Sequence, residues 1–115
     1  MKKLLTVVVL GATAMAAQAQ EVKGNVDAAK NKVAMCIGCH GIPGYRASFP
    51  EVYEVPLLGG QNAKYIENAL KEYQKGDRKH PTMRGIAATL SDQDIADVAA
   101  YYAQQKPDSQ NNTQK

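Results

Sequence analysis

The stretch Cys36-Ile37-Gly38-Cys39-His40 decides the fold of this 115-residue chain. Two cysteines separated by two residues and followed by a histidine form the attachment pattern of a c-type haem. Each sulfur can add to one vinyl group at the porphyrin edge, and the histidine ring then lies beneath the iron as its proximal ligand. The pattern therefore predicts one covalently attached haem c, with Cys36 and Cys39 as attachment residues and His40 as a ligand of the iron.

Thioredoxin-like redox centres, zinc sites and disulfides also use a C-x-x-C pair. A thioredoxin-like pair lies near a βαβ pattern, and the sequence shows no such pattern. A zinc site needs further ligands, but the chain has no third cysteine and, beyond His40, a single histidine, His80. The surroundings of the pair therefore favour haem over these three alternatives.

Residues 1–19 have the pattern of a secretory signal peptide. Lys2 and Lys3 precede an uncharged apolar run, and Ala17-Gln18-Ala19 fits a cleavage site before Gln20. A permanent membrane anchor is the alternative, but the run is short for a bilayer core of about 30 Å. We therefore expect cleavage and a periplasmic protein, because bacterial haem attachment of this kind takes place outside the cytoplasm.

Charge and length bound what the mature chain can do. Loss of Lys2 and Lys3 reduces the 14 basic residues to 12, against 11 acidic ones. This near balance argues against a nucleic-acid-binding protein, which would carry a basic stripe. A domain over residues 20–106 is too small to bury a large core unaided, so we expect the haem to form part of the core. The polar residues 107–115 are expected to be a disordered tail.

Two helices are predicted on either side of a long loop. Apolar residues recur at helical spacing over residues 20–34, where Asn25 is the expected N-cap and the helix runs into the haem motif. A second stripe of apolar residues at helical spacing predicts a helix over residues 63–75. The intervening residues 41–60 are rich in Gly and Pro and are expected to wrap one side of the haem.

A last helix is predicted to begin after its N-cap Ser91 and to end near Gln105. Before it, His80 and Met83 are the two candidates for the second axial ligand of the iron. Pro81 favours an extended residue 80, so Met83 lies on a stiffened loop or at the start of a short helix, just ahead of a helical stretch over residues 84–90. An imidazole ligand would lower the reduction potential and a thioether would raise it. The residues alone leave three possibilities open: either ligand, or an open iron with Met83 as packing.

Five stretches together resemble the class I c-type cytochromes. The resemblance is to the small periplasmic bacterial type, which also forms each half of the tandem dihaem cytochromes, and it covers residues 25–106. The matching stretches are MCIGCHG (35–41), PLLGGQ (56–61), YQKGDR (73–78), MRGIA (83–87) and LSDQDIA (90–96).

The resemblance implies an all-α fold with three main helices around the haem. It implies that Met83 is the distal ligand, that the Pro56 carbonyl accepts a hydrogen bond from the His40 ring, and that Leu58 packs on the haem. The residues after Gly44 depart from the family pattern. Here Tyr45 and Arg46 are candidates for contact with a haem propionate, with an exposed loop pair as the alternative.

The expected function is electron transfer by a monomeric carrier. The sequence shows no apparent general base, nucleophile or substrate pocket, so we expect no enzymatic activity. Such a carrier docks transiently on its redox donor and acceptor proteins through a small interface. There are two alternatives. The first is a permanently bound electron-transfer subunit of an oxidoreductase, and the second is a haem sensor or peroxidase whose iron has an open site. One cluster of side chains is either a basic docking patch or ordinary solvated surface: Lys71, Lys75, Arg78 and Lys79.

Overall fold

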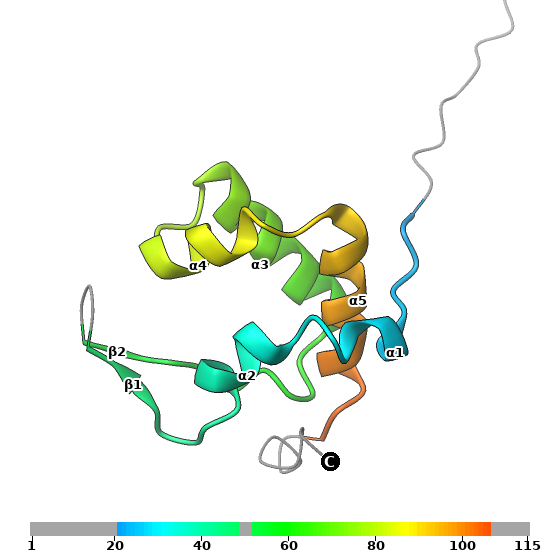
Figure 1. The fold of residues 1–115 in the computed structure, drawn as a ribbon. Helices are drawn as coiled ribbons and strands as arrows, with labels where there is room; N and C mark the ends of the chain where they lie inside the picture. Colours follow the sequence, from blue (N-terminus) through cyan, green and yellow to red (C-terminus); the bar gives the residue numbers. More distant parts are fainter. Residues whose placement is uncertain (1–20, 49–51, 107–115) are drawn as a thin grey trace, which may run out of the picture.

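The computed structural model describes residues 21–48 and 52–106. The signal peptide predicted for residues 1–19, the loop residues 49–51 and the tail predicted for residues 107–115 lie outside the described residues. Within the described part, short strands separate two groups of helices (Figure 1). The elements are α1 (Val26–Ala29), α2 (Ala34–His40), β1 (Arg46–Ala47), β2 (Tyr53–Glu54), α3 (Ala63–Lys75), α4 (Pro81–Ala87) and α5 (Asp92–Ala103).

Helix α3 has the predicted bounds, and both of its ends are capped as the sequence indicates. The Asn62 side chain accepts a hydrogen bond from the Tyr65 amide at 3.0 Å. At the other end, Gly76 adopts a left-handed conformation with φ of 85°, which a residue without Cβ tolerates best. The apolar stripe faces inward, with Ile66 and Leu70 buried.

Helix α5 forms the centre of the core, and α1 and α3 both pack against it (Figure 1). Its N-terminus carries a capping box, in which Ser91 and Asp94 each bind the backbone amide of the other. The predicted stripe is buried: Ile95, Val98, Ala99 and Tyr102. The helix ends at Ala103, slightly before the predicted end.

The single helix predicted over residues 20–34 is wrong in extent. The structure has two shorter helices, α1 and α2, joined by a tight turn in which the Lys32 amide binds the Ala29 carbonyl at 2.7 Å. The turn brings the Lys32 ammonium to α5, 2.6 Å from Asp94 Oδ1 and 2.7 Å from Asp97 Oδ2. Val22, which the periodicity placed on the helix, lies outside both helices and is exposed.

Helix α4 also differs from the prediction, because it covers residues 81–87 and not 84–90. Pro81 occupies the first turn, where its fixed φ and missing N–H are favourable, so the proline starts this helix. In the loop predicted for residues 41–60, β1 and β2 pair as a short antiparallel ladder with Arg46 opposite Glu54. Strands of two residues are too short to show an alternating pattern in the sequence.

Candidate functional site

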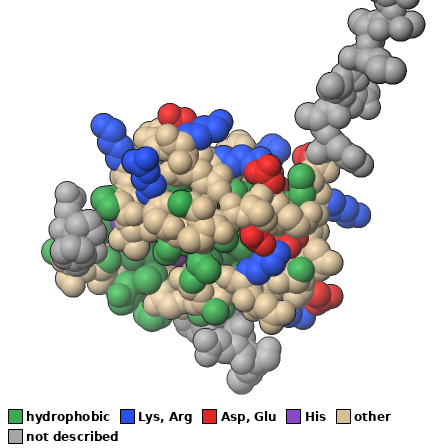
Figure 2. Space-filling model, turned by 45° about the horizontal axis from the view of Figure 1, so that its top comes forward, with side chains coloured by type: hydrophobic (Ala, Val, Ile, Leu, Met, Phe, Trp, Pro, Cys, Tyr) green, Lys and Arg blue, Asp and Glu red, His purple; other side chains and the backbone are tan. Residues whose placement is uncertain are grey.

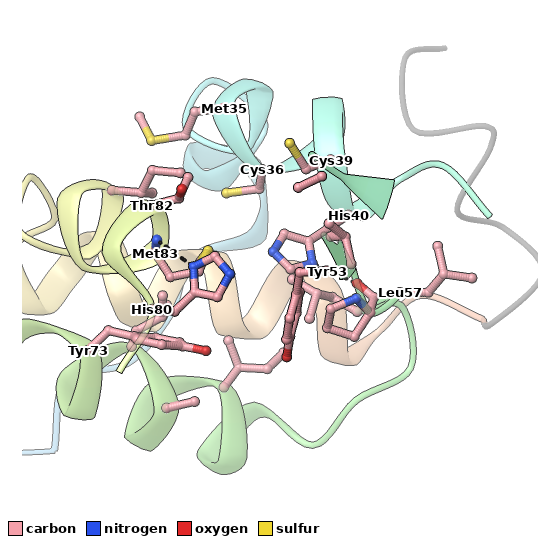
Figure 3. Close-up of a pocket in the computed structure, with 18 of the residues that line it drawn as sticks. Met35, Cys36, Cys39, His40, Tyr53, Leu57, Tyr73, His80, Thr82 and Met83 are labelled. Carbon is pink, nitrogen blue, oxygen red and sulfur yellow. Dashed lines mark hydrogen bonds between the residues drawn. The ribbon is translucent and has the colours of Figure 1, made fainter. Parts of the chain in front are cut away.

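A cavity of about 470 Å³ lies between α2, α3, α4 and the loop that contains β1 and β2. Its size is within the range of small-molecule and cofactor sites. Residues of the haem motif line one side, and His80 and Met83 of the α4 region line the other (Figure 3). The structure thus brings together every residue that the sequence predicts for the site: Cys36, Cys39, His40, Pro56, Leu58 and Met83.

The His40 ring is buried and its orientation is fixed by the backbone. Its Nδ1 lies 2.6 Å from the Pro56 carbonyl oxygen, the contact that the resemblance implies. A carbonyl only accepts, so Nδ1 carries the proton and Nε2 keeps its lone pair. Burial lowers the pKa of His40, although the bond to Pro56 opposes this shift, and the nearby His80 lowers it further. The result is a neutral ring whose Nε2 can bind a metal.

The two thiols lie at the cavity beside His40 (Figure 3). Burial raises the pKa of Cys36 to about 11, and the neighbouring Cys39 adds to this effect. Such a position disfavours a thiolate and suits a neutral thioether. The described residues contain no group of three or more His, Cys, Asp or Glu side chains that could hold a metal ion. The surroundings of the pair therefore fit haem attachment better than a zinc site.

Across the cavity, His80 and Met83 have different roles in the local structure. His80 is the N-cap of α4, and its Nδ1 accepts a hydrogen bond from the Met83 amide at 3.4 Å (Figure 3). The His80 ring also meets the Tyr53 ring edge-on, with centroids 4.9 Å apart. Because its Nδ1 acts as an acceptor, a neutral His80 carries its proton on Nε2 and has no free lone pair. The Met83 side chain is half-buried and has its sulfur on the cavity side.

The loop residues considered for propionate contact separate in the structure. Tyr45 lines the cavity. Arg46 is exposed beside Glu54, with 3.9 Å between their charged atoms, and does not line it. Arg78 does line the cavity, with its guanidinium about equally close to the rings of Tyr65 and Tyr73, at 5.7 and 5.5 Å from their centroids. From the sequence, Arg78 is predicted only as part of a surface patch, because the turn after Gly76 that brings it back to the rings of Tyr65 and Tyr73 has no side-chain pattern of its own.

A buried carboxylate also escaped the sequence prediction. Asp97 is 1% exposed and accepts hydrogen bonds from the Asn25 amide, the Lys32 ammonium and the Gln93 amide group. Burial raises its pKa, but these three donors outweigh burial, so the pKa lies below its ordinary value. This cluster is remote from the cavity and joins the start of the domain to α5.

Within residues 21–48 and 52–106, no helix combines the length and the apolar character that crossing a bilayer requires.

Comparisons with known proteins agree with this geometry. Residues 26–106 match the family described as Cytochrome c. Cytochrome c-554(548) of Halomonas halodenitrificans is 41% identical over 86 residues, which cover 72% of this chain and 99% of that protein. Cytochrome c4 of Pseudomonas aeruginosa is 38% identical over 108 residues, which cover 92% of this chain and 50% of that protein. A crystal structure of reduced recombinant cytochrome c4 from Pseudomonas stutzeri matches with a TM-score of 0.56 and 35% identity.

The structural match covers 72% of this chain and 46% of that chain, so the chain spans about half the length of these cytochrome c4 relatives. Fold and site together define a small helical haem protein. The chain belongs to the cytochrome c family. It is therefore an electron-transfer protein without enzymatic activity, and its haem c is covalently bound.

Proposed function

We propose that the chain is a periplasmic electron carrier whose haem is attached through Cys36 and Cys39 and ligated by His40 and Met83. The observation that carries the proposal is the different hydrogen bonding of the two histidine rings at the cavity. The Pro56 carbonyl accepts from Nδ1 of His40 and leaves its Nε2 free, whereas Nδ1 of His80 is engaged by the Met83 amide as the N-cap of α4. Bound haem supplies the redox centre, an iron that alternates between the ferric and ferrous states.

The protein's own residues have three tasks in this proposal. Pro56 holds the His40 ring in one orientation and one tautomer. Met83 offers a thioether, which favours ferrous iron and a higher potential. Apolar side chains exclude water from the haem faces, among them Leu58, Ile66 and Leu70, which line the cavity.

The surface around the cavity supports a docking role. Figure 2 shows hydrophobic side chains gathered on one side of the molecule. The large exposed ones that also line the cavity are Met35, Tyr53, Leu57 and Tyr65. We propose that redox partners dock here transiently and that the free protein is a monomer. A native mass measurement of the exported protein tests this, and a stable complex with an oxidoreductase would contradict it.

Carbon monoxide tests the carrier function against an open-site sensor or peroxidase. The ferrous holoprotein should not bind carbon monoxide at neutral pH, since His40 and Met83 would both bind the iron. The Met83→Ala variant, which loses one of them, should bind it and serves as the positive control. Ready binding to the wild-type protein would show an open iron and would contradict the proposal.

Export is proposed from the pattern of residues 1–19. The mass of the mature protein should correspond to a chain that begins at Gln20 and carries one haem. An intact Met1 in a membrane fraction would instead favour residues 1–19 as a permanent membrane anchor.

A further inference from the structure

The proposed iron ligand Met83 lies on a helix that is too short to hold itself in place. Helix α4 has seven residues, Pro81–Ala87, and isolated helices of this length are not stable in water. Its position relative to the haem must therefore come from contacts with the rest of the molecule. Helix α3 is the neighbour against which it packs.

One side chain of α3 binds the C-terminal end of α4. Gln74 Nε2 donates to the carbonyl oxygens of Ala87 and Leu90, at 2.8 Å each. Ala87 is the last residue of α4 and is fully buried, and the final carbonyls of a helix lack partners within the helix. A single amide thereby joins α3 to the end of α4 and to the link that leads into α5.

The two ends of α4 are thus held by different side chains. At the N-terminal end, His80 caps the Met83 amide from the residue next to the helix. At the C-terminal end, the hydrogen bonds come from Gln74, which is 13 residues before Ala87 in the chain. The His80 ring meets Tyr53 of β2, so the first end is held against the loop, whereas the Gln74 hydrogen bonds hold the second end against α3.

We propose that Gln74 is a positioning residue for the distal ligand, which keeps the Met83 sulfur at the iron by fixing α4 against α3. The inference rests on the proposed function, in which Met83 is that ligand. Gln74 does not line the cavity, so it acts only through α4. Without its two hydrogen bonds, α4 moves more freely and the Met83 sulfur leaves the iron more often.

Gln93 offers a matched control for the loss of two hydrogen bonds. Its Nε2 donates to the Lys23 carbonyl at 2.9 Å and to Asp97 at 2.8 Å. These acceptors lie at the start of the domain and on α5, away from α4. Gln74→Met and Gln93→Met therefore each remove two hydrogen bonds while they keep the length of the side chain, but only the first loosens the Met83 helix.

The test is the rate at which imidazole displaces the distal ligand of the ferric holoprotein, measured at saturating imidazole. In Gln74→Met, this limiting rate should rise about tenfold, since the Leu90 carbonyl loses its Gln74 donor and the Ala87 carbonyl keeps only the Leu90 amide. Gln74→Glu, which places a carboxylate against the same carbonyls, should raise it further. Gln93→Met should stay within about twofold of the wild-type rate although it too lowers the denaturation midpoint.

Equal rates in Gln74→Met and the wild-type protein would overturn the positioning role, as would equal increases in Gln74→Met and Gln93→Met. Far-UV circular dichroism shows whether each variant is folded during the measurement. If Gln74→Glu does not fold, the rate of Gln74→Met alone decides the test.

The ferric spectrum of the wild-type protein separates the failure of the Gln74 proposal from the failure of the Met83 assignment. If it lacks the weak sulfur–iron band, the Met83 assignment fails and the role of Gln74 falls with it. If the band is present and the rates are equal, only the role of Gln74 fails.

Discussion

A neutral histidine has one ring proton, and its neighbours decide which nitrogen carries it. His40 donates from Nδ1 to the Pro56 carbonyl, whereas His80 accepts at Nδ1 from the Met83 amide. The C-x-x-C-H pattern predicts the role of His40, whereas Met83 is favoured over His80 only through the family resemblance. The difference between the two histidines became visible only with the backbone groups around them, which the sequence does not place.

Gly24 is a residue-scale determinant of how the chain packs on α5. A Cβ at this position would meet the Ala96 carbonyl and would lie 2.8 Å from the Ala100 Cβ. We expect Gly24→Ala to destabilise the protein by about 1–3 kcal/mol, the usual cost of overpacking. Chemical denaturation followed by circular dichroism measures this.

Gly85→Ala is the control for that substitution, because a Cβ there meets nothing within 4 Å. Gly85 lies within α4, so alanine should leave stability unchanged or raise it by about 1 kcal/mol through helix propensity. A Gly24→Ala protein as stable as Gly85→Ala would show that the close approach to α5 is absent in solution.

At the scale of elements, the capping box of α5 predicts a measurable contribution from Ser91. Its hydroxyl accepts from the Asp94 amide at 3.1 Å, and Ser91→Ala removes this bond. The free energy of unfolding should fall by about 1 kcal/mol. Thr89→Ala, which removes a hydroxyl that donates to the Ile86 carbonyl near the end of α4, serves as a comparison outside the cap. An unchanged unfolding midpoint for Ser91→Ala would contradict the importance of the capping box.

Elements with strong local signals were predictable, and those shaped by distant contacts were not. Helix α3 has an apolar stripe, Asn62 at one end and Gly76 at the other, so its bounds follow from local chemistry. The break between α1 and α2 does not, because Lys32 turns toward two aspartates that lie more than 60 residues later. The helical stretch predicted from residue 84 begins later than α4, because Pro81 restricts residue 80 and yet itself fits the first turn of a helix.

At the scale of the whole molecule, the Lys32 cluster joins the beginning of the domain to its last helix and predicts a pH dependence. The bond to Lys32, together with those to Ser91, lowers the pKa of Asp94 from 3.8 to about 2. A carboxylate with a depressed pKa stabilises the fold above its unfolded pKa, and the contribution is lost as the pH falls through the folded pKa. The wild-type protein should therefore lose this contribution between about pH 4 and pH 2.

Asp94→Asn tests this dependence. The wild-type protein should be more stable than Asp94→Asn at pH 7, and the difference should shrink as the pH falls toward 2. Denaturant titrations of both proteins at several pH values measure the difference directly. A difference that stays constant over this range would show that the charge of Asp94 does not contribute.

The central claim is that Met83, and not His80, is the distal ligand of the iron. The most direct measurement is the red end of the ferric absorption spectrum at neutral pH. It is recorded for the wild-type, Met83→Ala and His80→Ala proteins. Sulfur–iron ligation predicts a weak band that is present in the wild-type protein, retained in His80→Ala and absent from Met83→Ala. A native spectrum that is lost in His80→Ala and unchanged in Met83→Ala would contradict the claim and would establish two histidine ligands.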